Sequence, residues 1–223
     1  MSLINIHTHH IEPHTNAIQV LNIDEIASFD FQVNTHKLSL GIHPNKIIEA
    51  TFDADFEILT QMAKHQNVIM IGECGLDRNS AVNFELQKKV FTAHLKLAEL
   101  LKKPVIIHCV RAFDELMSIK KKNNPQVPLI IHGYNNNQQI AQALVKQGFY
   151  LSLGTQLLNP SSNPAKNIKT IPLNRLFLET DDKNHTISSI FAVASSILNL
   201  QQTLLVDVIR ENYEKIFYAT NSL

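Results

Sequence analysis

Histidine and carboxylate side chains close several short apolar stretches of this 223-residue chain. The first stretch ends in His7-Thr8-His9, and residues two apart on a strand point the same way, so both histidines would share one face. Neutral imidazole nitrogen and carboxylate oxygen are ligands that zinc, manganese and related divalent cations prefer. The set therefore predicts a site for one or two divalent metal ions. Its members are His7, His9, Glu73, His108, His132 and Asp181.

Glu73 is the natural bridge in such a site. A carboxylate has two oxygens and can join two metals about 3.5–4 Å apart, which polarise a substrate oxygen and generate a hydroxide nucleophile near neutral pH. Each residue alone has a simpler explanation: a histidine that closes an apolar run is more often a core or surface residue, and Glu73 or Asp181 could cap a helix. Metal-compatible side chains at five separate strand ends favour metal binding over coincidence.

The elements that would position these residues alternate in type from about residue 50 onward. Brief, continuously apolar runs typical of buried strands are Val68–Gly72, Val105–His108, Leu129–Ile131, Tyr150–Ser152 and Arg175–Leu178. Apolar residues three and four apart, typical of helices, occur in Ala54–His65, Phe84–Leu101, Ala112–Lys121, Asn136–Gln147, Ile187–Leu198 and Gln201–Tyr218. Apolar strands joined by helices indicate a parallel sheet covered by helices.

The first 50 residues add strand candidates but no convincing helix: Leu3–His7, Ala17–Ile23 and Leu38–Gly41. Together these elements predict an α/β fold, a distorted TIM (β/α)8-like barrel with shortened N-terminal crossovers. The C-terminal strand ends of a barrel meet on the face that carries the chemistry. A doubly wound open sheet is the alternative, although no glycine-rich phosphate fingerprint follows a strand. No linker divides the chain, so residues 1–223 are expected to form a single domain, with Pro160–Pro164 as a loop or lid.

The composition excludes several classes of protein. Lys plus Arg equals Asp plus Glu at 20 each, and this zero net charge excludes a basic nucleic-acid coat protein and an acidic disordered tail. No apolar run approaches the roughly 20 residues of a membrane-spanning helix, and the first residues do not resemble a signal peptide. Two cysteines cannot build a disulfide framework. We therefore expect a cytoplasmic protein with no membrane association and no evident obligate protein partner.

Six sequence blocks in this order resemble the TatD-type metal-dependent hydrolases. The blocks are His7-Thr8-His9, Gly41-Ile42-His43-Pro44, Gly72-Glu73-Cys74-Gly75-Leu76-Asp77, Pro104-Val105-Ile106-Ile107-His108, His132-Gly133-Tyr134 and Leu178-Glu179-Thr180-Asp181. The segment Asn212-Tyr213-Glu214-Lys215-Ile216-Phe217 resembles the closing motif of that family. The likeness covers the first nine residues and nearly the whole chain from residue 41 onward.

The resemblance implies a distorted TIM barrel of the amidohydrolase superfamily that holds one or two divalent metal ions (Zn, Mn or Mg). It also implies hydrolysis of phosphoester bonds, commonly described as deoxyribonuclease activity. By position, one metal would be held by His7, His9 and Asp181, the other by His108 and His132, with Glu73 between them.

The resemblance further implies roles in the reaction. Asp181 would orient the attacking water or take its proton, so Asp181 and Glu73 are the expected catalytic residues. His43 and Arg111 would bind the substrate phosphate, Arg111 by forked hydrogen bonds. The sequence departs from the family where Asn5 replaces a usual Asp, in the short stretch from residue 9 to 41, and in a short loop after Asp181 without the usual proline.

Three functions compete on this basis. The leading hypothesis is a metal-dependent phosphodiesterase, an exonuclease-like enzyme that acts on DNA ends or on a small phosphoester. An amidohydrolase or lactonase acting on a small metabolite would use the same ligands, because the fold does not choose among these bonds. A non-catalytic metal-binding remnant is the third hypothesis, motivated by Asn5 and the shortened N-terminal side.

The remaining histidines and other reactive residues have simpler explanations. His10 and His14 are expected in a solvated loop, and His36, His65, His94 and His185 are ordinary surface or helix residues. Cys74 and Cys109 should pack in the interior and not act as nucleophiles. The lysines at 102–103 and 120–122 are most simply solvated helix ends, although they could bind a phosphate backbone with modest, salt-dependent affinity.

Overall fold

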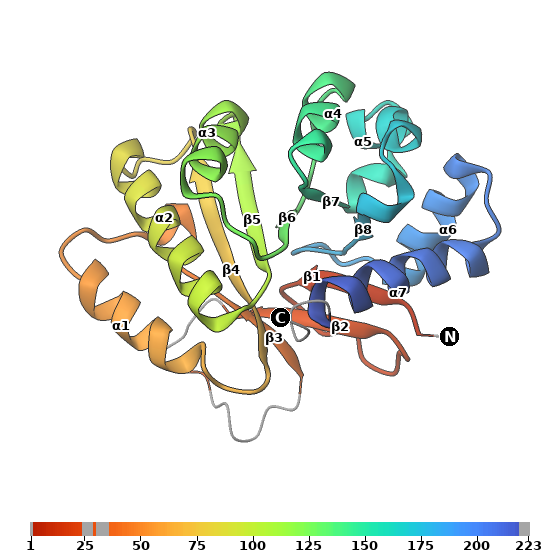
Figure 1. Ribbon diagram of the computed structural model, residues 1–223. Helices are drawn as coiled ribbons and strands as arrows, with labels where there is room; N and C mark the ends of the chain where they lie inside the picture. The colour runs from red at the N-terminus through yellow and green to blue at the C-terminus, as the bar shows by residue number, and fades with distance from the viewer. Residues whose placement is uncertain (1, 24–28, 30–35, 219–223) are drawn as a thin grey trace. The chain divides into compact units, whose positions relative to one another are not determined.

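The computed structural model describes residues 2–23, 29 and 36–218. In this part of the chain the strands belong to one sheet in chain order, and every recorded pair is parallel. Figure 1 labels the strands β1 (Ile4–Thr8), β2 (Ile18–Ile23), β3 (Lys37–Leu40), β4 (Val68–Asp77), β5 (Val105–Val110), β6 (Leu129–Ile131), β7 (Tyr150–Leu153) and β8 (Leu176–Leu178).

Helices occupy most of the connections after β3. They are α1 (Phe52–Met62), α2 (Phe84–Leu101), α3 (Phe113–Asn123), α4 (Gln138–Lys146), α5 (Asn163–Asn167), α6 (Ile187–Leu198) and α7 (Gln202–Tyr218), with short 3-10 turns between some of them. Within the described ranges no single helix combines the length and apolar composition needed to cross a membrane. Only α6 and α7 taken together pass on those two properties, and they are bent by 109° at the break between them.

The chain divides into two compact units. Unit 1 contains Met1–Leu21 and Ile130–Leu223, and unit 2 contains Asn22–Leu129. The boundaries fall inside β2 and next to the first residue of β6. The single domain expected over residues 1–223 stays a prediction.

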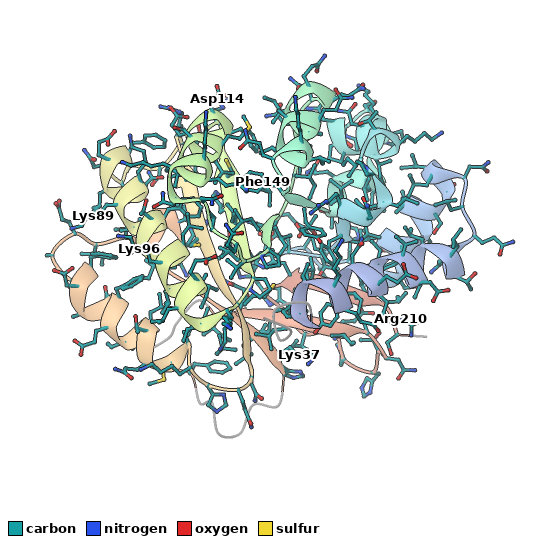
Figure 2. All side chains as sticks on the ribbon, viewed as in Figure 1. Lys37, Lys89, Lys96, Asp114, Phe149 and Arg210 are labelled. Carbon is teal, nitrogen blue, oxygen red and sulfur yellow. The ribbon has the colours of Figure 1, made fainter. Side chains whose placement is uncertain are left out.

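In unit 1, β1 is buried along its whole length, as expected for a strand covered on both faces. It pairs with β2 at Ile4 and Ile18, and Thr8 forms a parallel bridge with Asp181 just after β8. Most buried side chains of the unit are apolar; one of them is Phe149, which directly precedes β7 and is labelled in Figure 2.

In unit 2, β3, β4 and β5 pair side by side, and α1, α2 and α3 follow β3, β4 and β5 in the chain. β4 does not end at Gly72, as the sequence predicts, but continues to Asp77. The sequence did not predict this extension because glycines interrupt the apolar run. A Cβ at Gly72 or Gly75 would lie within about 2.1 Å of the carbonyl oxygens of Ile106 and His108 in β5. The close passage of β5 therefore requires glycine at both positions.

The other predicted elements agree with the structure to within a few residues, with one correction. Pro160–Pro164 is not wholly a loop, because α5 begins at Asn163. Ser162 caps this helix by accepting a hydrogen bond from the Ala165 N–H (3.2 Å), and Pro164 lies in its first turn, where a missing N–H costs nothing.

Candidate active site

Unit 1 assembles His7, His9, His132 and Asp181, which we call the unit 1 cluster. His7 lies in β1 and His9 one residue after it, His132 follows β6, and Asp181 follows β8. One ligand atom from each of His7, His132 and Asp181 lies within 4.8 Å of the others. The Oδ1 atom of Asp181 is 3.4 Å from His7 Nε2 and 3.6 Å from His9 Nε2. The carboxylate therefore faces both histidines of the His-x-His pair.

Backbone hydrogen bonds hold Asp181 in this position. Its N–H donates to the His7 carbonyl (3.2 Å), and its own carbonyl accepts from the His9 N–H (3.0 Å). Asp181 has a φ of +57°, a left-handed conformation that a non-glycine residue adopts only at a cost. The backbone bonds to His7 and His9 keep it there.

Asn5 reinforces the same junction. Its Nδ2 donates to Thr180 Oγ1 (2.8 Å) and its Oδ1 accepts from the Thr180 N–H (3.1 Å), while the Thr180 hydroxyl donates to Thr8 Oγ1 (3.0 Å). All three residues are buried. The Asn5 amide both donates and accepts hydrogen bonds, so it joins the ends of β1 and β8 without carrying a charge. Asn5, which stands where the family usually has Asp, therefore still holds β1 in place.

Glu179 is a member of the site that the sequence did not single out. It is fully buried, its Oε1 accepts a hydrogen bond from the Gly133 N–H (2.5 Å), and the same oxygen lies 3.7 Å from His132 Nδ1. A carboxylate behind a metal-binding histidine fixes the orientation of the ring and raises its basicity. Its position directly after the apolar residues of β8 is the sequence feature from which its role could have been predicted.

Unit 2 assembles a second group, His43, Glu73 and His108, which we call the unit 2 cluster. One ligand atom from each lies within 4.8 Å of the other two. Glu73 Oε1 is 3.0 Å from His108 Nδ1 and 3.2 Å from His43 Nε2. Glu73 is nearly buried, and its backbone N–H donates to the side-chain oxygen of Asn22 (2.8 Å). His43, expected to bind substrate, thus lies beside the carboxylate in a position suited to a metal ligand.

Asp77 orients His108 from the other side. Its Oδ2 lies 3.1 Å from His108 Nε2, so the two ring nitrogens of His108 face two different carboxylates. Asp77 is held by its backbone, whose N–H donates to Gln87 Oε1 (2.8 Å) and whose carbonyl accepts from Gln87 Nε2 (3.1 Å). Gln87 is fully buried in α2. Because β4 runs on to Asp77, one strand supplies both carboxylates that face His108.

His94 supports the segment before His43. It lies in a helix, α2, as the prediction of a surface or helix residue allows, but it is fully buried, and its Nε2 accepts a hydrogen bond from the Ile42 N–H (3.0 Å). Its Nδ1 lies 2.8 Å from the Val90 carbonyl oxygen. Burial lowers the pKa of His94 to about 4, so the ring is neutral near pH 7 and can accept from Ile42.

Both clusters have the donor chemistry and spacing of a divalent metal site. Two ligand atoms bound at about 2.1 Å to one tetrahedral metal lie about 3.4 Å apart. The carboxylate-to-imidazole distances of 3.4 and 3.6 Å in the unit 1 cluster, and of 3.0 and 3.2 Å in the unit 2 cluster, lie close to that value. The residues present therefore fit a bound divalent cation in each unit.

Four further residues with expected roles, or an expected lack of one, are His132, Arg111, Cys74 and Cys109. His132 groups with His7 and Asp181, and the bridging role of Glu73 stays a prediction. Arg111 is exposed directly after β5, with a left-handed φ of +52°, and its role toward phosphate also stays a prediction. Burial raises the pKa of the Cys74 thiol well above its usual value and that of Cys109 to about 12, so neither supplies a thiolate near neutral pH.

Comparison with known proteins gives a consistent result. The profile of the family described as TatD related DNase matches residues 7–218. The uncharacterized metal-dependent hydrolase YabD of Bacillus subtilis is 28% identical over 195 residues, which cover 80% of this chain and 76% of YabD. The 3'-5' ssDNA/RNA exonuclease TatD of Pantoea ananatis is 30% identical over 145 residues, which cover 63% of this chain but only 55% of that protein.

The fold also matches a solved structure. The TatD homolog YjjV of Escherichia coli superimposes with a TM-score of 0.83 at 23% identity, over 97% of this chain and 98% of that chain. This likeness confirms the predicted fold class, the TIM-type (β/α)8 barrel. The family match over most of the sequence confirms the resemblance and the expected class of metal-dependent hydrolase. The chain belongs to the family of TatD-related DNases.

Proposed function

We propose that this protein hydrolyses phosphodiester bonds of single-stranded nucleic acid, from an end of the strand, with divalent metal ions as cofactors. The observation that carries the proposal is the pair of clusters, each of which places a carboxylate oxygen 3.0–3.6 Å from two imidazole nitrogens. The exonuclease name of the Pantoea relative supports the choice of nucleic acid as substrate.

The metal ligands in this proposal come from both units. His7, His9, His132 and Asp181 would hold a cation in unit 1, and His43, Glu73 and His108 would hold one in unit 2. Imidazole-rich sets suit zinc or manganese better than magnesium, which favours oxygen ligands. Bound divalent ions supply charge that polarises the phosphoryl oxygen and lowers the pKa of water.

The protein groups perform the remaining steps. Asp181, whose side chain is 32% exposed, uses a carboxylate oxygen to orient the attacking water and accept its proton. Arg111, exposed at the end of β5, binds the phosphate oxygens through its forked N–H groups. Glu179 and Asp77 hold His132 and His108 in the orientation that metal binding requires.

The decisive experiment measures release of nucleotides from end-labelled single-stranded DNA and RNA. We expect Mn²⁺- or Zn²⁺-dependent activity that chelation abolishes. Asp181→Asn should lower kcat by at least 100-fold, because the amide cannot accept the proton. The matched control, Asp207→Asn on α7, changes the same charge in a surface pair with Arg210 and should leave kcat unchanged.

Two results would contradict the proposal. The first is full activity of the wild type after chelation. The second is hydrolysis of carboxylic esters, lactones or amides with no hydrolysis of phosphodiesters, which would favour the amidohydrolase or lactonase alternative. Labels at the 3' and 5' ends compared in parallel identify the end at which degradation begins.

A further inference from the structure

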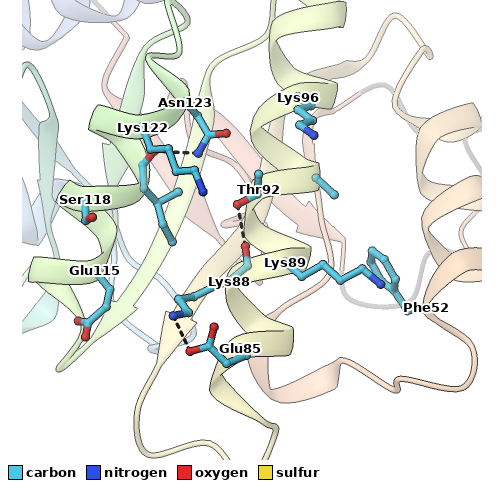
Figure 3. A pocket seen from close by; sticks show the side chains of 12 residues that line it. Phe52, Glu85, Lys88, Lys89, Thr92, Lys96, Glu115, Ser118, Lys122 and Asn123 are labelled. Carbon is cyan, nitrogen blue, oxygen red and sulfur yellow. Dashed lines mark hydrogen bonds and ion pairs between the residues drawn. The ribbon is translucent and has the colours of Figure 1, made fainter.

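A charged groove lies between α2 and α3 in unit 2, apart from the unit 2 cluster (Figure 3). Its volume is about 650 Å³, and its walls carry more lysine than any other residue type. The four lysines are Lys88, Lys89, Lys96 and Lys122, and the two acidic side chains are Glu85 and Glu115. We call it the α2–α3 groove.

The acidic side chains of the groove are engaged with basic ones. Glu85 pairs with Lys88 (2.5 Å), and Glu115 pairs with Arg78 in the loop between β4 and α2. Three lysines therefore carry charge that these carboxylates do not offset: Lys89, Lys96 and Lys122, all exposed. Among the described residues, no ion pair is recorded for these three, and Lys89 lies over the Phe52 ring at 5.6 Å.

The three lysines are arranged along the groove, not around one point. Lys89 and Lys96 are seven residues apart on α2, which places them on the same helix face about 10 Å apart along the axis. Lys122 comes from the last turn of α3, whereas Lys89 extends from α2 toward Phe52, on the side away from α3 (Figure 3). A row of cations about two helical turns long fits the successive phosphates of a strand better than a single small anion.

One wall residue of the groove contacts the loop that follows β4. Glu115, on its wall, pairs with Arg78, which directly follows Asp77, and Asp77 contacts His108. The Arg78 guanidinium also lies over the Phe84 ring, 4.3 Å from its centre, at the start of α2. The Glu115 end of the groove therefore lies beside the segment that directly follows β4, the strand that carries Glu73.

We propose that the α2–α3 groove binds the backbone phosphates of the single-stranded nucleic-acid substrate, on the part of the strand that the active site is not cleaving. This role rests on the proposed nuclease function and deepens it. The net charge of the chain is zero, so attraction for a polyanion beyond the proposed active site depends on local concentrations of cations such as this one. The contribution to affinity is electrostatic and depends on salt.

The test compares a triple variant, Lys89→Gln, Lys96→Gln and Lys122→Gln, with a control that removes three exposed lysines elsewhere, Lys64→Gln, Lys146→Gln and Lys215→Gln. KM is measured for oligonucleotides of about 4 and about 20 nucleotides, spanning common single-strand site sizes. Hydrolysis of bis(4-nitrophenyl) phosphate reports the chemistry alone. We expect the groove variant to lose the KM advantage of the longer strand, with kcat and small-substrate hydrolysis unchanged. An equal loss in the control variant, or no loss in the groove variant, would overturn the proposal.

A binding measurement keeps this proposal separate from the nuclease activity. Asp181→Asn protein, with and without the groove substitutions, is titrated into a fluorescent 20-nucleotide strand over a range of salt concentrations. Loss of three single-strand phosphate contacts should reduce the salt slope by about 2, so the parent should lose about 20-fold more affinity than the groove variant between 50 and 200 mM salt. Identical salt slopes for the parent and the groove variant would refute phosphate binding by the α2–α3 groove, even if the protein is an active nuclease. Equal competition by inorganic tripolyphosphate would indicate a small-anion site and likewise overturn it.

Discussion

Glu179 is a fully buried carboxylate that lies beside His132, one of the candidate metal ligands. Its Oε1 is shared between the Gly133 N–H and His132, and its Oε2 has no hydrogen-bond partner among the described residues. A Cβ at Gly154 would approach the Glu179 side chain to 3.3 Å, a tight contact, so glycine at this position leaves room for it. Burying a carboxylate is costly, and its proximity to His132 offsets part of that cost.

We therefore predict that Glu179→Gln weakens metal binding while the fold remains intact. The amide keeps the size of the side chain but loses the charge that orients and polarises His132, a change that typically costs 10–100-fold in metal affinity. Competition with a chromophoric chelator measures the affinity, and Glu211→Gln, exposed on α7, is the control. Equal affinity in wild type and Glu179→Gln would show that Glu179 does not act through His132.

At the scale of the elements, α2 supports the unit 2 cluster through two buried polar side chains. Gln87 holds the backbone of Asp77, and His94 holds the backbone of Ile42, next to His43. Both lie on the buried face of an otherwise amphipathic helix. The helix therefore links the end of β4 to the segment after β3.

His94 makes stability depend on pH in a defined direction. Its pKa is lowered from 6.5 to about 4 in the folded protein, so the unfolded chain binds the proton more tightly. The stabilisation is complete above pH 6.5 and is lost progressively as the pH falls toward 4, by about 3 kcal/mol in total.

We expect His94→Gln, which keeps an acceptor for Ile42 but does not titrate, to show a flatter fall in unfolding free energy between pH 6.5 and 4. Urea denaturation at several pH values measures this difference. The exposed His185→Gln should follow the wild-type curve. A His94→Gln profile parallel to the wild type would contradict the assignment.

The sequence predicted most elements because buried strands appear as brief, continuously apolar runs, whereas amphipathic helices are longer and place apolar residues three and four apart. It failed where a contact from another element decides the local structure. The C-terminal end of β4 could not be predicted locally, because it depends on the close contact of β5 with Gly72 and Gly75. The role of His94 depends on a hydrogen bond from Ile42, which is 52 residues away in the chain. Strand-end histidines were predictable from the sequence because their positions relative to apolar runs are local. The supporting residues, Glu179 and Asp77, were not singled out, since only the fold shows which histidine each one faces.

At the scale of the whole molecule, each compact unit contains a group of three potential metal ligands whose donor atoms lie within 4.8 Å of one another. Cations that bind only the folded chain stabilise it by mass action, by about 2.7 kcal/mol per site at a concentration 100 times the dissociation constant. Metal removal should therefore lower thermal stability as well as activity.

We predict that chelation lowers Tm by about 5–10 °C for each emptied site in a chain of this size. Calorimetry of the zinc- or manganese-loaded and stripped protein measures the shift. Glu73→Gln and Asp181→Asn should each remove part of it, because each changes the carboxylate of one cluster. An unchanged Tm after chelation, with metal loss verified by elemental analysis, would refute metal binding as a source of stability.

The division of the chain has a consequence for the order in which the protein assembles during synthesis. Unit 1 contains both the first 21 residues and everything from residue 130, whereas unit 2 is contiguous from Asn22 to Leu129. Domains fold as the ribosome releases them from the N-terminus, so unit 2 can complete its contacts while β1 still waits for its partners. His7 and His9 leave the ribosome first, yet the carboxylate that faces them, Asp181, emerges more than 170 residues later. Ribosome-bound nascent chains would therefore gain the unit 2 cluster before the unit 1 cluster.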